Sequence, residues 1–351
     1  MNILVTSREL DIAGYDMLSR IAEESNINVY ITISHNDERV LVKGNCIPVF
    51  SPQINSKFSI KAIKSLRRII DKYKIDIVFS PSSAALSNAF IASIGKNVKN
   101  VGYRGTQARV RKTDPTYYLG ILNPMLSHIV CETNDIRDYL SQFIPTKKLS
   151  VITKPFDLKW VEQAMLHPLQ IDNLSQGAKT CVYIARCKNR PYKGLTLLIE
   201  AINILNNKNI HLIFIGDYDE ADYEMAQRSE MRNNIHFVGL KDNAIYYLPL
   251  QTMFVLPSLR DASPRVLREA MACGLPCVVS NIPGARDLIV DEETGLLFDS
   301  NSANSLACKI NKLLNNEVLC KSMGEAGKKR IADVYGVNVY TDKFKNLFMS
   351  M

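Results

Sequence analysis

The chain has 351 residues, of which 46% are hydrophobic and 22% are charged, with eight cysteines and five histidines. This length accommodates two α/β domains, and the apolar runs are too short to cross a membrane. The cysteines form no CxxC pair and the histidines show no metal-ligand spacing, which favours a reduced cytoplasmic chain without a structural metal. The first residues are typical of a strand rather than of a signal peptide.

The formal net charge of +8 is distributed unevenly along the chain. Residues 1–155 hold 21 basic and 13 acidic side chains, whereas residues 156–351 hold 22 of each. We therefore expect the first half to face an acidic partner: anionic lipid, a pyrophosphate-linked lipid or a phosphorylated saccharide. No nucleic-acid-binding module and no interleaved aromatic residues accompany the basic residues, so nucleic acid is not expected as a partner.

The first half predicts alternating strands and helices. A strand over residues 3–6 leads to a helix that begins near Gly14 and runs to about residue 24. Further strands are predicted over 28–34, 47–50 and 75–80. The segment 57–74 is amphipathic with a basic face, which fits either a crossover helix with a solvated face or a helix lying on a membrane surface.

A basic cluster follows the next predicted strand, over residues 100–106. This strand ends in Arg104-Gly105-Thr106, and Arg109 follows closely. A guanidinium cannot act as a general base at neutral pH, but it can hold a phosphate or a carboxylate. The cluster fits either an anion site or a solvated loop.

In the second half, three predicted strands end in loops that suit ligands. The strand over 180–185 leads to Arg186 and then to Lys193-Gly194, before the next helix. The strands over 211–216 and 235–240 contain Gly216 and Gly239 at their ends, where the backbone must turn or approach a ligand closely.

The central stretch of the chain, residues 254–287, predicts a strand, a loop, a helix and a second strand. Pro264 suits the first turn of the helix and Gly274 ends it. Asp261 and Glu269 lie eight positions apart. A helix of that length spans about 12 Å, whereas the two carboxylates of a glycosidase lie about 5–10 Å apart. Because the free N–H groups of a helix N-terminus favour a phosphate, the spacing suggests a nucleotide sugar as ligand.

Residues 269–276 read Glu-Ala-Met-Ala-Cys-Gly-Leu-Pro, with Asp261 ahead of them. This stretch resembles the signature of retaining glycosyltransferases of the GT-B fold, in particular the large family 4 (group 1). The resemblance implies an α/β fold of two Rossmann-like domains, whose parallel sheets face each other across a cleft. Two departures from the pattern concern the donor sugar: Asp261 replaces the usual Glu, and residues 262–264 replace the usual Gly-x-Gly.

The resemblance also implies roles for individual residues. Arg186 and Lys193 would clamp the donor diphosphate, Asp261 would hold the donor sugar, and Glu269 would hold the ribose hydroxyls. The residues implied for donor binding are Glu269, Ser263, Pro264, Arg265, Val266, Gly216, Val238, Gly239, Leu240 and Gly14. Those on the acceptor side are Arg104, where many family members have His, together with Thr106 and Arg109. For Gly14, an ordinary strand–helix turn is an equal alternative.

The expected domains are an acceptor-binding domain over 1–158, a linker over 159–178, a donor-binding domain over 179–333, and a helix over 334–351 that returns to the first domain. The expected function is metal-independent and cofactor-free transfer of a hexose-type sugar from a UDP- or GDP-sugar. The acceptor would be a saccharide or lipid-linked glycan in surface polysaccharide, lipopolysaccharide or capsule synthesis, and the basic first domain could contact anionic membrane.

Two alternatives remain open from the sequence. Asp261, Arg104 and the lone Gly14 also fit a non-catalytic nucleotide-sugar-binding partner that scaffolds glycan assembly. A nucleotide-sugar epimerase of the same fold would need no acceptor.

Overall fold

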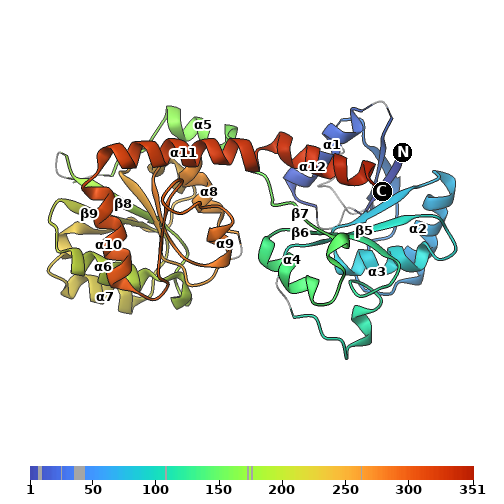
Figure 1. Ribbon diagram of the computed structural model, residues 1–351, viewed down its shortest axis with the longest axis horizontal. Helices are drawn as coiled ribbons and strands as arrows, with labels where there is room; N and C mark the ends of the chain where they lie inside the picture. Colours follow the sequence, from blue (N-terminus) through green and yellow to red (C-terminus); the bar gives the residue numbers. More distant parts are fainter. Residues whose placement is uncertain are drawn as a thin grey trace. The chain divides into compact units, whose positions relative to one another are not determined.

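The computed structural model describes residues 1–6, 10–24, 26–34, 44–106, 109–171, 174, 177–261 and 263–351. The chain divides into two compact units (Figure 1). The first unit consists of Met1–Pro155 and Val337–Met351, and the second consists of Phe156–Gly336.

The first unit contains a parallel sheet of seven strands in the order β3-β2-β1-β4-β5-β6-β7. The strands are β1 (Asn2–Val5), β2 (Asn28–Ile33), β3 (Ile47–Phe50), β4 (Ile77–Ser80), β5 (Lys99–Arg104), β6 (Leu126–Cys131) and β7 (Leu149–Val151). Its helices are α1 (Ile12–Ala22), α2 (Ile60–Lys72), α3 (Ser83–Ala92), α4 (Asn134–Ser141) and α12 (Val337–Met349). The strand order reverses between β1 and β4, and open α/β sheets bind ligands at such switch points.

Alternate residues of these strands point to opposite faces of the sheet, which gives the first unit two apolar layers. Ile3 and Val5 pack with α1 and α12 on one face, while Leu4 packs with α2 and α3 on the other. On the first face, the ring of Phe79 lies 5.5 Å from that of Phe344 and 5.8 Å from that of Phe348. The last helix therefore completes the core of the first unit, where Figure 1 shows it beside α1.

The second unit contains a parallel sheet of six strands in the order β10-β9-β8-β11-β12-β13. The strands are β8 (Lys179–Ile184), β9 (Ile210–Ile215), β10 (Ile235–Phe237), β11 (Met253–Leu256), β12 (Cys277–Ser280) and β13 (Leu296–Phe298). The helices are α5 (Lys159–Leu166), α6 (Leu195–Leu205), α7 (Glu220–Arg228), α8 (Arg265–Ala272), α9 (Pro283–Arg286), α10 (Ala303–Leu314) and α11 (Glu317–Tyr335). The switch point lies between β8 and β11, as the predicted Rossmann-like topology requires.

Several boundaries differ from the sequence-based ones. The segment expected as a linker contains α5, which belongs to the second unit because Val161 and Ala164 on its inner face are buried. The final helix begins at Val337, after Gly336, rather than at 334. Helix α1 begins two residues before Gly14, because the Asp11 carboxylate caps it. Pro264 precedes α8 with an extended ψ of 107°, so it is the N-cap rather than part of the first turn.

Candidate functional site

The carboxyl ends of β8 and β9 approach each other closely in the second unit. The Ala185 N–H donates to the Ile215 carbonyl (3.1 Å), and the Gly216 N–H donates to the Gly239 carbonyl (3.1 Å). A Cβ atom on Gly216 would lie only 1.7 Å from the Ala185 carbonyl oxygen, so this position requires glycine. Gly216 therefore has a packing role between two strand ends.

The loop over 186–193 is fixed from two sides by backbone hydrogen bonds. On one side the Cys187 N–H donates to the Asp217 carbonyl at 3.0 Å. On the other, the Leu259 N–H donates to the Tyr192 carbonyl at 2.8 Å. Gly194 then starts α6 with φ +76°, and a Cβ there would lie 2.3 Å from the Pro257 carbonyl oxygen. The loop thus bridges the loops that follow β9 and β11.

Three of the predicted site residues meet at this switch point. The Lys193 Nζ lies 2.9 Å from the Asp261 Oδ2, and the two side chains are 20% and 21% exposed. The second carboxylate oxygen of Asp261 accepts from the Ser263 N–H at 3.4 Å. Buried Arg268 donates to the Ser263 hydroxyl at 3.1 Å. Arg186 has an exposed side chain at the start of the same loop.

The second predicted carboxylate, Glu269, lies within α8 and is already paired. The Arg265 Nε donates to it at 2.9 Å; the Glu269 side chain is 15% exposed and that of Arg265 is 74% exposed. Burial raises the pKa of Glu269, and the Arg265 guanidinium opposes that rise. Arg265 also lies over the Trp160 ring, 5.8 Å from its centroid. Arg265 therefore acts here as a partner of Glu269, while Pro264 is buried and Val266 half-buried at the start of α8.

The loop after β10 holds the remaining predicted donor residues beside an aromatic group. The Val238 N–H donates to the Phe214 carbonyl (2.9 Å), Gly239 has φ +78°, and Leu240 is 60% exposed. The ring of Tyr218 stacks on that of Tyr223, with 5.8 Å between the ring centroids, and its centroid lies 4.6 Å from that of the tilted Phe237 ring. This aromatic group was not predicted from the sequence, although aromatic residues near two neighbouring strand ends were a visible signal.

The first unit contains a pocket at the carboxyl ends of β4, β5, β6 and β7, with a volume of about 340 Å³. Its polar lining includes Ser82, Ser83, Arg104, Thr106, Glu132 and Lys154. Arg104 donates through Nε to the Thr106 carbonyl at 2.9 Å. Buried Glu132 accepts from the Tyr103 hydroxyl at 3.0 Å. Burial, more than the Glu132 charge, raises the pKa of Tyr103, which therefore stays a hydrogen-bond donor.

The pocket includes two of the three predicted acceptor-side residues. Arg109 is exposed outside the lining, and its carbonyl accepts from the Tyr117 hydroxyl at 2.8 Å. Gly14 is not among the lining residues either, and its N–H donates to the capping carboxylate of Asp11 at 2.9 Å. The same carboxylate pairs with Lys154 at 2.9 Å. Glu132 and Lys154 were missed, although a charged residue just after a buried strand marks the ligand edge of a parallel sheet.

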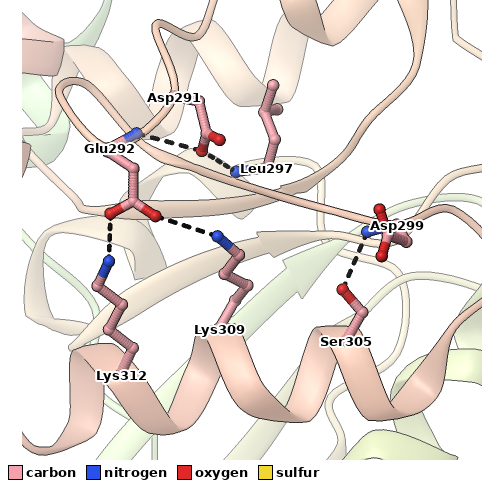
Figure 2. Close-up of polar contacts among 7 residues, drawn as sticks. All are labelled: Asp291, Glu292, Leu297, Asp299, Ser305, Lys309 and Lys312. Atoms are coloured by element: carbon pink, nitrogen blue, oxygen red, sulfur yellow. Dashed lines mark hydrogen bonds and ion pairs between the residues drawn. The ribbon is translucent and has the colours of Figure 1, made fainter.

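Downstream of β12, a turn is fixed onto α10 (Figure 2). Glu292 has φ +67° and pairs with Lys309 at 3.1 Å and with Lys312. The Asp291 carboxylate accepts from the Leu297 N–H at 2.7 Å, which fixes the start of β13. These contacts give the Thr-Gly-Leu-Leu-Phe segment at 294–298 a role in placing the edge strand.

Metal binding and membrane insertion each require a recognisable local feature. No group of three His, Cys, Asp or Glu side chains suited to a metal ion occurs among the described residues. None of the helices in the described ranges combines the length and apolarity that crossing a bilayer requires.

Comparisons with known proteins connect this geometry to a family. Residues 170–330 match the family model described as glycosyl transferases group 1. A curated relative from Escherichia coli, UDP-Gal:alpha-D-GlcNAc-diphosphoundecaprenol alpha-1,3-galactosyltransferase, is 22% identical over 328 residues, which cover 88% of this chain and 84% of that protein.

Two solved structures share the whole architecture. A glycosyltransferase from Rickettsia africae superposes with a TM-score of 0.78 at 19% identity, covering 99% of this chain and 98% of its own. Anabaena HepE in complex with UDP gives a TM-score of 0.75 at 16% identity, with full coverage of both chains. Residues 170–330 therefore belong to the group 1 glycosyltransferases, and the chain as a whole has the two-domain GT-B fold of such enzymes.

Proposed function

We propose that this glycosyltransferase is a retaining hexosyltransferase of family 4 that uses a nucleotide diphosphate sugar. The observation that carries the proposal is the meeting of Lys193, Asp261 and Ser263 at the switch point of the second sheet. A cation, a carboxylate and backbone N–H groups converge there at the start of α8. This combination suits a ligand that carries both phosphate and hydroxyl groups.

In this proposal the second unit binds the donor. Lys193 and exposed Arg186 hold the diphosphate and stabilise the negative charge that grows on it as the sugar leaves. Asp261 leaves Lys193 and accepts hydroxyl groups of the donor sugar. Glu269 accepts the ribose hydroxyls after Arg265 swings away, which its 74% exposed side chain allows. Because two cations neutralise the diphosphate, the reaction needs no metal ion and no cofactor.

We further propose that the acceptor hydroxyl attacks from the face that the leaving diphosphate occupies, and that a phosphate oxygen takes its proton. The new bond joins the anomeric carbon to the acceptor oxygen, while the bond from that carbon to the diphosphate breaks. Retention of the anomeric configuration is the direct test. The proton coupling at the anomeric carbon of the product would match the donor for a retaining enzyme and differ for an inverting one.

The pocket of the first unit is the proposed acceptor site. Its Arg104 and Lys154 suit an anionic group, while its Ser82 hydroxyl and the Glu132 carboxylate suit sugar hydroxyls. The Escherichia coli relative is named for a diphospholipid-linked acceptor. We propose a saccharide or lipid-linked acceptor of the same kind for this chain, in the synthesis of a surface polysaccharide, lipopolysaccharide or capsule.

We propose that α2 brings the first unit to the inner face of an anionic cytoplasmic membrane. Lys61, Lys64 and Arg68 are exposed on this helix, and Phe58 and Ile60 at its start are 57% and 59% exposed. Exposed cations beside exposed apolar side chains suit a charged lipid surface. Co-sedimentation with anionic vesicles, lost in a variant with glutamine at the three basic positions and absent with neutral vesicles, tests this contact.

A thermal-shift screen against UDP, GDP, ADP and CMP, with and without their sugars, tests the donor site. A ligand at about 100 times its dissociation constant adds about 2.7 kcal/mol of stability. We expect a selective shift with UDP, because UDP is the nucleotide bound to the HepE structure. No shift with any nucleotide would contradict the proposal. Turnover that is unchanged by EDTA supports the metal-independent mechanism.

The pairing of both predicted carboxylates with basic side chains favours one alternative, a non-catalytic nucleotide-sugar-binding partner. Titration with a UDP-sugar distinguishes the two. The enzyme releases UDP when an acceptor extract is added, whereas the binding partner shows a thermal shift and no release. An epimerase would convert the donor sugar without any acceptor.

A further inference from the structure

A buried tyrosine lies directly beneath the loop that carries the two proposed diphosphate cations. Tyr183, in β8, is 0% exposed, and its hydroxyl donates to the Lys193 carbonyl at 2.6 Å. Burial raises the pKa of this hydroxyl well above the usual value, so it stays protonated and remains a donor. Buried Cys187 lies 4.0 Å from the same hydroxyl through its Sγ. The phenol thus reaches from the sheet to the end of the loop.

The middle of the 186–193 loop is held by the side chain of Asp219, which does not cap its own helix. Asp219 is the N-cap of α7, a position where an Asp side chain ordinarily caps its own helix. Its carboxylate makes no such bond and instead accepts from the Asn189 N–H, at 3.1 Å from each oxygen. Asn189 has φ +59°, a left-handed conformation that a non-glycine residue keeps only where its surroundings hold it.

Two acidic side chains contact this loop, although the loop is proposed to bind an anion. Asp217 and Asp219 place two carboxylates against the loop that is proposed to bind a diphosphate, and the Lys188 N–H donates to the first of them at 3.1 Å. Like charges near a binding site lower the affinity for an anion. The hydrogen bonds to the backbone of residues 188 and 189 supply a geometric reason for acidic residues at this place.

We propose that Tyr183 and Asp219 are positioning residues, which hold the 186–193 loop where Lys193 can grip the donor diphosphate. The proposal rests on the donor site described above. Only the short segment between Asn189 and Gly194 fixes the position of Lys193. Its Nζ must meet the diphosphate within a few tenths of an ångström, because a misplaced charge loses most of its catalytic value.

The experiment replaces Tyr183 with phenylalanine, which keeps the buried ring and removes the hydroxyl. Calorimetry measures the dissociation constants of UDP and of UMP, which lacks the phosphate that Lys193 would hold. We expect Tyr183→Phe to weaken UDP binding about tenfold, the effect of one lost buried hydrogen bond, and to leave UMP binding unchanged. The ratio of the two constants therefore reports on the loop and not on overall stability.

Tyr335→Phe is the matched control. The Tyr335 hydroxyl also donates to a backbone carbonyl, that of Asp287, and its side chain is also buried in the second unit. We expect this variant to lose similar stability and to keep the UDP-to-UMP ratio of the unmodified protein. An equal fall of UDP and UMP affinity in Tyr183→Phe, or an equal change of the ratio in both variants, would overturn the positioning role.

Asp219 gives a second measurement that does not depend on the buried ring. Asp219→Ala should weaken UDP binding selectively, while Asp219→Asn should restore it, because an amide oxygen still accepts from the Asn189 N–H. If the unmodified protein binds neither nucleotide, the proposed donor site itself is refuted, and the positioning role with it. If the unmodified protein prefers UDP and every variant keeps that preference, only the positioning role is refuted.

Discussion

The two units place charged side chains at equivalent sheet edges in different ways. In the second unit the charges are paired with each other: Lys193 with Asp261, and Arg265 with Glu269. In the first unit, Arg104, Glu132 and Lys154 surround a pocket of about 340 Å³. A ligand of the second unit must exchange both of these ion pairs for its own contacts, whereas a ligand of the first unit enters a formed pocket in which Lys154 is also paired, with Asp11. Substitutions in the second unit should therefore change how well a ligand competes with the ion-pair partners. Substitutions in the first unit should remove direct contacts with the ligand.

The largest effect is expected from Lys193→Met. The variant removes a cation from the proposed leaving group and leaves the carboxylate of Asp261 without its partner. Loss of one such group typically lowers the rate of the chemical step about 10² to 10³-fold. We expect a fall of this size in sugar transfer, measured as UDP release at saturating donor.

Lys188→Met is the control for that measurement. Lys188 lies on the same loop with an exposed side chain, and its contact with Asp217 uses the backbone N–H. It should transfer sugar at a rate close to that of the unmodified protein. Equal losses in the two variants would show that general positive charge matters rather than the Lys193 contact.

Asp261→Ala tests whether the Asp261 carboxylate competes with a phosphate for Lys193. Because the Asp261 carboxylate pairs with Lys193 at 2.9 Å, its removal frees the cation for a phosphate. We expect transfer to slow about 10²-fold, while the affinity for bare UDP stays equal or increases. Glu269→Ala should do the reverse and weaken UDP binding first. Parallel losses of transfer and UDP affinity in Asp261→Ala would contradict the role given to this residue.

The comparison also explains how far the sequence alone could lead. Arg186 and Lys193 lie in one loop, and Asp261 and Glu269 in one loop and helix, so local spacing and the family resemblance are enough to indicate them. The alternation of strands and helices predicted an α/β fold, whereas the GT-B arrangement and the return of the final helix were implied by the family resemblance. The Arg265–Glu269 pair was missed, because the pattern does not show which way a long side chain turns.

The pocket of the first unit could not be predicted without knowing the strand order of the sheet. Four different strands, widely spaced in the sequence, bring residues to the lining: Arg104 ends β5, while Ser82, Glu132 and Lys154 follow β4, β6 and β7. Only the order β4-β5-β6-β7 brings their ends side by side. Arg104 and Thr106 could be predicted because they are adjacent to a strand end in a basic cluster. Arg109, from the same cluster, is not part of the pocket lining.

Arg104→Met tests the open site and should have an intermediate effect. If Arg104 contacts an anionic group of the acceptor, its loss costs one charge-assisted hydrogen bond, about 1.5–3 kcal/mol. We expect the KM for the acceptor to rise at least tenfold, with the dissociation constant of UDP unchanged. Arg109→Met, outside the pocket, is the matched control and should leave both values unchanged. A weaker affinity for UDP in Arg104→Met would show that this residue contacts the donor and not the acceptor.

The smallest effect concerns acid stability and a histidine pair of the second unit. His211 Nδ1 and His236 Nε2 lie 2.8 Å apart. The Asn234 amide donates its two hydrogens to the carbonyls of Lys208 and Ile210, and its nitrogen lies 3.3 Å from His211 Nε2. Because this amide nitrogen cannot accept, a proton on His211 fits at Nδ1, from which it donates to His236, and not at Nε2. A proton added to His211 Nε2 would face the amide nitrogen of Asn234, and one added to His236 Nε2 would face the Nδ1–H of His211. Either proton would place two hydrogen-bond donors against each other.

Acid should accordingly weaken the second unit. Burial lowers the pKa of both histidines, and His211 lowers that of His236 further. The unfolded chain thus binds protons more readily, so the free energy of unfolding is highest above about pH 6.5 and falls as the pH drops below it. Each proton contributes at most about 1.4 kcal/mol per pH unit. Trp160 is the sole tryptophan and lies in the second unit, so its fluorescence during urea unfolding at pH 7.5 and pH 5.5 measures the loss.

His236→Gln should flatten this dependence, because one of the two titrating groups is gone and the amide can still accept from His211. His167→Gln, which removes an exposed histidine of the same unit, should keep the slope of the unmodified protein. Identical slopes in all three proteins would mean that the pair tolerates a proton, for instance by rotation of the half-buried His236 ring. In that case the buried polar contact would stabilise the unit at every pH, and acid sensitivity would have to come from elsewhere in the chain.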